Sequence, residues 1–275
     1  MLDLLAGAAL MAQCQGKEGW SDPAPPAKIH GQTYYVGTCG ITAILIMTPK
    51  GHVLIDGGPA EAGPLVAANI RKVGARLRDV KLILASHEHH DHVGGLATLQ
   101  KLTGAIVRAG PAATPVLASG KIARIDPQYG LLKPFAPVRT GRPLRDGRDV
   151  GIGSIGLTPH FTPGHAPGGT SWTWRSCEKG RCITLAYADS LSAVSADGYR
   201  FRDHPERSAA LKSSFATVRK LDCDLLLTPH PSASGLFERM AGIEPLMDRN
   251  ACAAYASRGA AGLEARLAKE AGAVR

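Results

Sequence analysis

The stretch LILASHEHHDHVGGL, residues 82–96, places four histidines, a glutamate and an aspartate in six consecutive positions directly after an apolar run. Along an extended segment, side chains two positions apart point the same way, so His87 and His89 can hold one ion from one side. Asp91 and His92 begin the next element and turn elsewhere. Nitrogen and oxygen ligands without thiolate are typical of a catalytic zinc site. Their number fits two ions better than one.

Two further histidines follow predicted strands in the same way. His165 lies in the tight loop of HFTPGHAPGG (160–169), and His230 ends the apolar strand of LLLTPHPSAS (225–234). A lone histidine in such a place is more often a surface or core residue than a ligand. Because both occupy the same strand-to-loop context as the histidine cluster, we expect them to supply the missing ligands.

The rest of the chain alternates strand and helix patterns in two halves. A strand meander runs from Thr33 to Gly58, broken by glycines and turns. Without a linker or low-complexity segment between the halves, one domain of two β-sheets covered by helices is predicted. The further elements expected are a helix over 62–77, a strand over 80–86, a helix beyond the histidine cluster, strands over 155–161, 170–176 and 182–190, a helix over 205–221, a strand over 223–230 and a final helix over 247–271.

Charge and hydropathy limit the partners of the protein. The 32 Lys and Arg residues exceed the 23 Asp and Glu residues by nine, but they are scattered and no aromatic residues alternate with them. A nucleic-acid partner is therefore not expected, whereas a weak field favouring small anionic substrates is. No apolar run approaches the roughly 18 residues of a membrane span, so membrane insertion is not expected either.

The N-terminus and the cysteines indicate the compartment. Residues 1–12 resemble the end of a secretory signal, which leaves 13–275 as a single domain, although an ordinary N-terminal segment is the alternative. The six cysteines form no CxxC pair, and CEKGRC (177–182) is typical of a disulfide across a hairpin tip. Paired cysteines favour an oxidising compartment, so a periplasmic or secreted protein is predicted.

Several motifs resemble those of one known family. SHEHHDHVGGL matches the HxHxDH signature of the metallo-β-lactamase superfamily, and VLIDGG with Asp56, TPGHAPGG and YADS are similar to its recurring motifs, in order over residues 33–234. The resemblance implies an α+β fold, the αββα four-layer sandwich, with two zinc ions at one edge. His89, at a position where glutamate would resemble the di-iron branch, favours zinc.

Within the superfamily, the chain is most similar to the subclass B3 metallo-β-lactamases. The similar segments are YYVGTCGITAIL, ANIRKVG, YADSLSA and FATVRKLDCDLLLTPHPSAS. The resemblance implies two ligand sets: His87, His89 and His165 for one zinc, and Asp91, His92 and His230 for the other.

The same resemblance assigns further residues. Ser190 and Ser192 are implied to recognise the substrate carboxylate, and Asp56 is expected to orient the ligand loop by hydrogen bonds rather than to bind zinc. Glu88 and His90 occupy the variable positions of the motif and are expected to point away from the metals or into contacts behind the ligands. The implied disulfides are Cys14–Cys39, Cys177–Cys182 and Cys223–Cys252.

The implied activity is zinc-dependent hydrolysis of the lactam ring of penicillins, cephalosporins and carbapenems, which confers antibiotic resistance. Zinc lowers the pKa of bound water to about 7, and the resulting hydroxide attacks the lactam carbonyl. The three-histidine zinc polarises that carbonyl, and the other zinc stabilises the released nitrogen anion while Asp91 orients the nucleophile. The substrate is a small molecule and the enzyme is expected to be a monomer.

Two alternatives compete with this interpretation. A thioesterase of the glyoxalase II type or a lactonase would have the same motifs, and Asp189 of YADS would then bind the metals. A zinc-dependent binding or structural protein would need closed coordination, but six ligands over two ions leave each with only three and therefore with open positions. The sequence does not predict which β-lactams are preferred.

Overall fold

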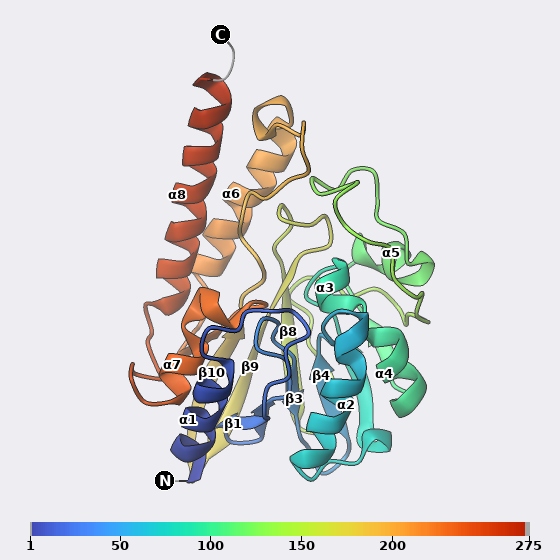
Figure 1. Cartoon of the computed structure of the whole chain (residues 1–275), viewed down its shortest axis with the longest axis vertical. Helices are drawn as coiled ribbons and strands as arrows, with labels where there is room; N and C mark the ends of the chain where they lie inside the picture. The colour runs from blue at the N-terminus through green and yellow to red at the C-terminus, as the bar shows by residue number, and fades with distance from the viewer. Residues whose placement is uncertain (1, 273–275) are drawn as a thin grey trace.

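The N-terminal half of the chain forms a six-stranded sheet in the order β1-β2-β3-β4-β5-β6 (Figure 1). The computed structural model describes residues 2–272. Neighbours from β1 to β4 are antiparallel, whereas β4, β5 and β6 are parallel. The strands are β1 (Ala27–His30), β2 (Thr33–Tyr35), β3 (Ile44–Ile46), β4 (His52–Ile55), β5 (Val80–Leu84) and β6 (Ile106–Arg108).

The C-terminal half contributes a five-stranded sheet in the order β11-β10-β9-β8-β7. Only the β10–β11 pair is parallel; the other neighbours are antiparallel. The strands are β7 (Val150–Ile152), β8 (Ile155–Phe161), β9 (Thr170–Glu178), β10 (Arg181–Tyr187) and β11 (Leu225–Leu227).

Helices cover the outer face of each sheet. One group lies against the first sheet and the other against the second, as Figure 1 shows for α2, α4 and α5 on one side and α6 and α8 on the other. The first group is α2 (Gly63–Lys72), α3 (His90–Val93), α4 (Leu96–Thr103) and α5 (Ala113–Ser119); the second is α6 (Pro205–Arg219) and α8 (Ala251–Gly272).

The strands are apolar on both faces because both faces are buried. In β3, Ile44 and Ile46 face the second sheet, while Leu45 between them faces the helices. The inner layer also contains Trp172 and Leu185 of the second sheet, both fully buried. Continuous apolar runs are the pattern expected of strands covered on two sides. The αββα sandwich is thereby confirmed.

The N-terminal helix α1 (Leu2–Cys14) packs against α7 (Leu236–Met240). Leu10 is fully buried, and a Cβ on Gly7 would overlap the carbonyl oxygen of Met240. The interpretation of residues 1–12 as a signal remnant stays a prediction. Among the described helices, none is both long and apolar enough to cross a membrane.

All six cysteines are paired, as Cys14–Cys39, Cys177–Cys182 and Cys223–Cys252. These are the three pairs that the sequence resemblance implied. Cys177 and Cys182 face each other at the tip of the β9–β10 hairpin, where Lys179 and Gly180 both have positive φ, 48° and 80°. Two positive φ values are typical of the type I′ turn that matches the twist of the strands.

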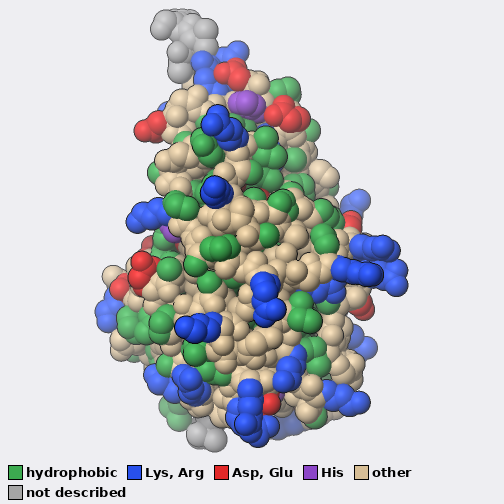
Figure 2. All heavy atoms as spheres, turned by 90° about the vertical axis from the view of Figure 1, so that its right-hand side faces the viewer, with side chains coloured by type: hydrophobic (Ala, Val, Ile, Leu, Met, Phe, Trp, Pro, Cys, Tyr) green, Lys and Arg blue, Asp and Glu red, His purple; other side chains and the backbone are tan. Residues whose placement is uncertain are grey.

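Basic side chains are spread over the surface. On the face seen in Figure 2, Lys and Arg side chains stand between stretches of uncharged surface and do not line one groove. On this face the positive charge is therefore distributed rather than focused on one site.

Candidate metal centre

The candidate ligands lie where strands of both sheets end. The loop after β5 carries His87 and His89, and the short helix α3 continues with Asp91 and His92. The second sheet supplies His165 from the loop between β8 and β9, and His230 from the segment after β11. The ends of strands from both sheets thus bring side chains from distant parts of the sequence to one edge of the sandwich.

The structure brings all six residues together in two overlapping groups. One ring nitrogen from each of His87, His89 and His165 lies within 4.8 Å of the other two, and all three residues are buried. Ligand atoms of His87, Asp91 and His92 also lie within 4.8 Å of one another. In the second group, Asp91 Oδ2 is 3.1 Å from His92 Nε2 and 3.6 Å from His230 Nε2. The arrangement fits two adjacent ions.

Carboxylates fix the rings of two of these histidines. His87 donates from Nδ1 to Asp189 Oδ1 at 2.7 Å, which directs Nε2 into the site. His89 donates from Nε2 to Asp126 Oδ2 at 3.0 Å, which directs Nδ1 there. Carboxylate partners of this kind set the tautomer of a metal-binding imidazole and raise its basicity.

Backbone carbonyls fix two more rings. His165 Nδ1 donates to the carbonyl oxygen of Ser192 at 3.0 Å, and His230 Nδ1 donates to that of Gly40 at 3.2 Å. In both cases Nε2 points towards the site. Four of the five imidazoles are therefore oriented through the nitrogen that does not face the cluster.

Some buried ring nitrogens lack a hydrogen-bond partner among the described residues, and a bound metal ion would satisfy them. His87 Nε2 and His92 Nδ1 are buried and have no hydrogen bond within the described part of the chain. An unsatisfied buried polar atom costs about 1–3 kcal/mol. Imidazole nitrogens and a carboxylate are the donor set that zinc prefers, so these residues fit the group that the fold implies.

The electrostatics favour the metal-binding forms of His87, Asp91, His165 and His230, whereas Asp91 and Asp56 outweigh burial and raise the pKa of His92. Burial lowers the pKa of His165 to about 3 and that of His230 to about 4, and neighbouring histidines add to the effect. The pKa of His87 lies well below its ordinary value for the same reasons. For Asp91, burial raises the pKa, but the surrounding histidines, His92 foremost, outweigh it and hold the pKa below its usual range.

Asp56 supports the ligand loop from behind. Its carboxylate accepts hydrogen bonds from Ser86 N at 2.8 Å, Ser86 Oγ at 2.7 Å and Tyr187 Oη at 2.7 Å. It is fully buried, and its φ of 59° is unusual for a residue other than glycine. Because Ser86 directly precedes His87, this contact holds the start of the ligand loop. That Asp56 orients the loop for metal binding stays a prediction.

The two serines differ in their surroundings. Ser190 is buried beside Asp189, and Ser192 Oγ lies 3.0 Å from His165 Nδ1. The structure thus links Ser192 to a candidate ligand by both its hydroxyl and its carbonyl oxygen. Recognition of a substrate carboxylate by Ser190 and Ser192 stays a prediction.

Several residues around the centre stand outside the motifs of the sequence and were not predicted. Asp126 holds His89, Gln128 Nε2 is 3.4 Å from His165 Nε2, and the half-exposed Trp20 ring lies 5.7 Å from that of His90. A cavity of about 530 Å³ beside the centre is lined in part by Trp20, Gln128 and Leu131. No motif in the sequence connects these residues to the histidines, so only the fold relates them.

Glu88 has a defined contact behind the ligands. It is buried, and both carboxylate oxygens accept the Gly168 N–H, at 2.9 and 3.1 Å. Burial raises the pKa of Glu88 to about 7. The residue thereby connects the loop of His87 and His89 to the loop of His165.

Comparisons with known proteins identify the family. The sequence profile of the metallo-β-lactamase superfamily matches residues 36–179, just over half of the chain. The protein therefore belongs to the metallo-β-lactamase superfamily of hydrolases.

Within this superfamily, the chain is similar to solved structures of subclass B3 metallo-β-lactamases. The metallo-β-lactamase MIM-1 from Novosphingobium pentaromativorans is 51% identical, with a TM-score of 0.95 over 98% of this chain and 100% of MIM-1. MEM-A1, a subclass B3 metallo-β-lactamase from a soil metagenome library, is 46% identical, with a TM-score of 0.90 over 92% of this chain and 99% of MEM-A1. The protein is most similar to subclass B3 enzymes.

Curated relatives are more distant. A hydroxyacylglutathione hydrolase of Anaeromyxobacter dehalogenans is 30% identical over 64% of this chain, which spans only 55% of that relative. The N-acyl homoserine lactonase AttM of Azorhizobium caulinodans is also 30% identical, over 64% of this chain and 74% of its own length.

Proposed function

We propose that the protein is a zinc-dependent β-lactamase of subclass B3 that opens the lactam ring of penicillins, cephalosporins and carbapenems and so confers antibiotic resistance. One observation carries the proposal: the six residues implied by the B3 resemblance converge at one edge of a chain that matches a B3-type enzyme over nearly its whole length. The proposed cofactor is two zinc ions per chain.

The chemistry follows from the ligand arrangement. When bound, zinc provides a nucleophile at neutral pH and Lewis-acid polarisation of a carbonyl oxygen. Asp91, ionised between His92 and His230, is placed to accept a hydrogen bond from the attacking water and to orient it. Trp20, whose ring lies 6.3 Å from that of His230, supplies an apolar wall for the substrate next to the centre.

The proposed location is the periplasm or the cell exterior, with the protein acting as a monomer. Three disulfides support an oxidising compartment, since such bonds are rare in reducing cytosol.

The test is hydrolysis of a carbapenem by purified, zinc-loaded protein, followed by loss of the absorbance of the ring. Rapid loss that stops with a chelator and returns with zinc is expected. Serine-directed acylating inhibitors should have no effect, because no serine acts as the nucleophile. An intact carbapenem beside rapid hydrolysis of a thioester or lactone would overturn the proposal.

A thioesterase or lactonase is the second candidate, and Asp189 is the residue that separates the two. Curated relatives with those activities match the chain, and Asp189 Oδ2 is buried without a hydrogen bond within the described residues. In the β-lactamase proposal, Asp189 only orients His87 through Oδ1.

The variant Asp189→Asn tests this difference by metal titration. If Asp189 only orients His87, affinity at the three-histidine site should fall by about 10–100-fold, with both sites still able to fill. Weakening of both sites together would instead indicate that Asp189 binds both metals, as the second candidate requires.

A further inference from the structure

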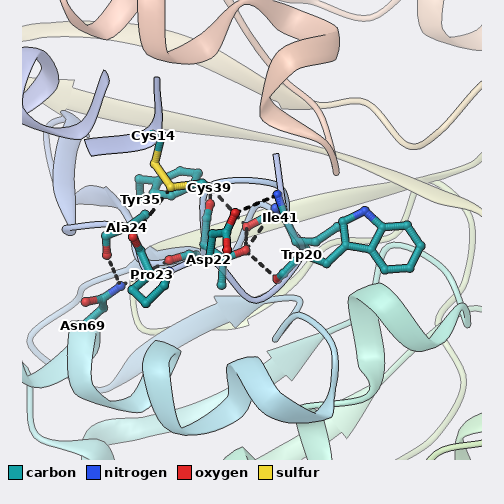
Figure 3. Close-up of a disulfide and its surroundings, with 12 residues drawn as sticks. Cys14, Trp20, Asp22, Pro23, Ala24, Tyr35, Cys39, Ile41 and Asn69 are labelled. Carbon is teal, nitrogen blue, oxygen red and sulfur yellow. Dashed lines mark hydrogen bonds between the residues drawn. A yellow bond between two sulfur atoms is a disulfide. The ribbon is translucent and has the colours of Figure 1, made fainter. Parts of the chain in front are cut away.

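An N-terminal segment, here called the anchor segment (residues 14–23), lies against the loop of residues 37–42 (Figure 3). The Cys14–Cys39 disulfide joins the two covalently. Cys39 N–H donates to the Asp22 carbonyl oxygen at 2.9 Å, and Thr38 Oγ1 donates to that of Trp20 at 2.8 Å. The segment is thereby fixed to the loop at three points.

The same loop holds the candidate ligand His230. The Gly40 carbonyl oxygen, next in the chain after Cys39, accepts the Nδ1–H of His230 at 3.2 Å. Thr42 N–H donates to the carbonyl oxygen of Pro229 at 2.8 Å. The position of the loop therefore sets both the backbone before His230 and the direction of its ring.

Packing between the anchor segment and this loop is tight at one point and open nearby. A Cβ on Gly40 would overlap the carbonyl oxygen of Glu18, so the two backbones touch there. Next to this contact, a cavity of about 430 Å³ separates the segment from Pro231 and Phe237. Because side chains do not fill this space, packing contributes little there, and the position of the anchor segment relative to the loop depends more strongly on the disulfide.

We propose that the Cys14–Cys39 disulfide is a positioning element for His230, which selectively sets the affinity of the Asp91–His92–His230 metal site. The inference rests on the two-metal site of the proposed function. The other site should not respond, because its ligands are oriented from elsewhere, by Asp189, Asp126 and Ser192.

The test compares two double variants of the full chain. Cys14→Ser/Cys39→Ser removes the proposed positioning element. Cys223→Ser/Cys252→Ser removes a disulfide of similar sequence separation, 29 residues against 25, so the general effect of a lost cross-link is matched. Serine variants are preferable to thiol reductants, because thiolates bind zinc themselves.

Metal-free proteins are titrated with zinc in competition with a chromophoric chelator, which gives a dissociation constant for each site. The variant His230→Ala shows which of the two constants belongs to the Asp91–His92–His230 site. For Cys14→Ser/Cys39→Ser we expect about tenfold weaker binding at that site and an unchanged first site. In the His230→Ala background, the same double variant should leave the remaining site unchanged. Cys14→Ala/Cys39→Ala, which removes the same disulfide without placing hydroxyls at two buried positions, should reproduce the selective loss and serves if the serine variant does not fold.

Three results would overturn the inference: unchanged dissociation constants, equal weakening of both sites, or the same selective loss in Cys223→Ser/Cys252→Ser. Failure of the proposed function gives a different result, since the wild type would then bind fewer than two zinc ions or leave the carbapenem intact.

Discussion

Glu88 shows how a residue between two ligands can connect separate loops. Its side chain crosses from the His87–His92 loop to the backbone of Gly168, and a Cβ at Gly168 would lie 2.5 Å from Glu88 Oε2. Glycine at 168 therefore allows the approach that the buried carboxylate needs. From the sequence, Glu88 is expected to point away from the metals or into contacts behind the ligands, and its bond to Gly168 is of the second kind.

Glu88→Gln should change the pH dependence of stability in metal-free protein. The pKa of Glu88 is about 7 in the folded protein, against an ordinary value of 4.5. Between these pH values the folded state holds a proton that the unfolded chain has lost, so wild-type stability falls as pH rises. Glutamine carries no such proton. Relative to wild type, the variant should therefore have a higher Tm at pH 8 than at pH 5. The corresponding change in the relative free energy of unfolding is up to about 3 kcal/mol.

Thermal unfolding at the two pH values checks this prediction. Glu264→Gln, at an exposed site with 65% of the side chain accessible, is the control and should show little pH-dependent change relative to wild type. A Tm difference for Glu88→Gln that is the same at both pH values would contradict the prediction.

Among the elements, helix α6 packs closely against the loop that carries His165 and fixes its position. Gly164 has φ of 139°, and a Cβ there would lie 2.6 Å from Leu211 Cγ of α6. Both the backbone conformation and the helix contact therefore require glycine directly before the candidate ligand.

Gly164→Ala should destabilise the protein by about 1–3 kcal/mol and weaken zinc binding at the three-histidine site. Urea unfolding and zinc titration measure the two effects. Gly262→Ala, on the exposed face of α8 with open space around it, is the matched control and should be neutral or stabilising by up to about 1 kcal/mol. Full stability in Gly164→Ala would show that the loop can rearrange.

The elements themselves were largely predictable from the sequence. The strand expected over 155–161 is β8 with the same bounds. The helix expected over 62–77 ends earlier, at Lys72, because Gly74 adopts a φ of 86° and turns the chain. The final helix begins at Ala251 rather than 247, since the Asp248 side chain accepts the N–H of Asn250 and forms a turn first.

The packing of α1 was less accessible to sequence analysis. Residues 2–14 form a helix that packs mainly against α7 and β1. Local composition there is equally typical of a signal segment, so periodicity alone cannot decide between them. Only the tertiary contact at Gly7 shows how closely this helix approaches α7.

For the whole molecule, the main consequence is that the candidate ligands come from both sheets. The first sheet supplies His87, His89, Asp91 and His92, and the second supplies His165 and His230. Bound metal would therefore connect the two halves. The convergence of the six candidate ligands was predictable, because each stands in a recognisable motif or at a strand end; that they bind metal stays a prediction. Asp126 and Gly40 were not predictable, because only the assembled fold brings them to the histidines.

Removal of metal should therefore lower the Tm of the entire domain. A ligand that binds only the folded state stabilises it by about 4 kcal/mol when its free concentration is a thousand times its Kd. Thermal unfolding with zinc, with a chelator, and with zinc restored measures the effect. An unchanged Tm after verified removal of metal would contradict a role for the ions in joining the sheets.

The parallel pairing of β10 with β11, with α6 inserted between them, also has a kinetic consequence. Non-local pairings of this kind form late, because closing the long intervening segment costs conformational entropy before the strand contacts can compensate for it. His230 follows β11, so the Asp91–His92–His230 group is completed only when this pairing has formed. Zinc uptake at that group would then mark the end of folding, and a refolding chain would gain secondary structure before it could retain its second ion.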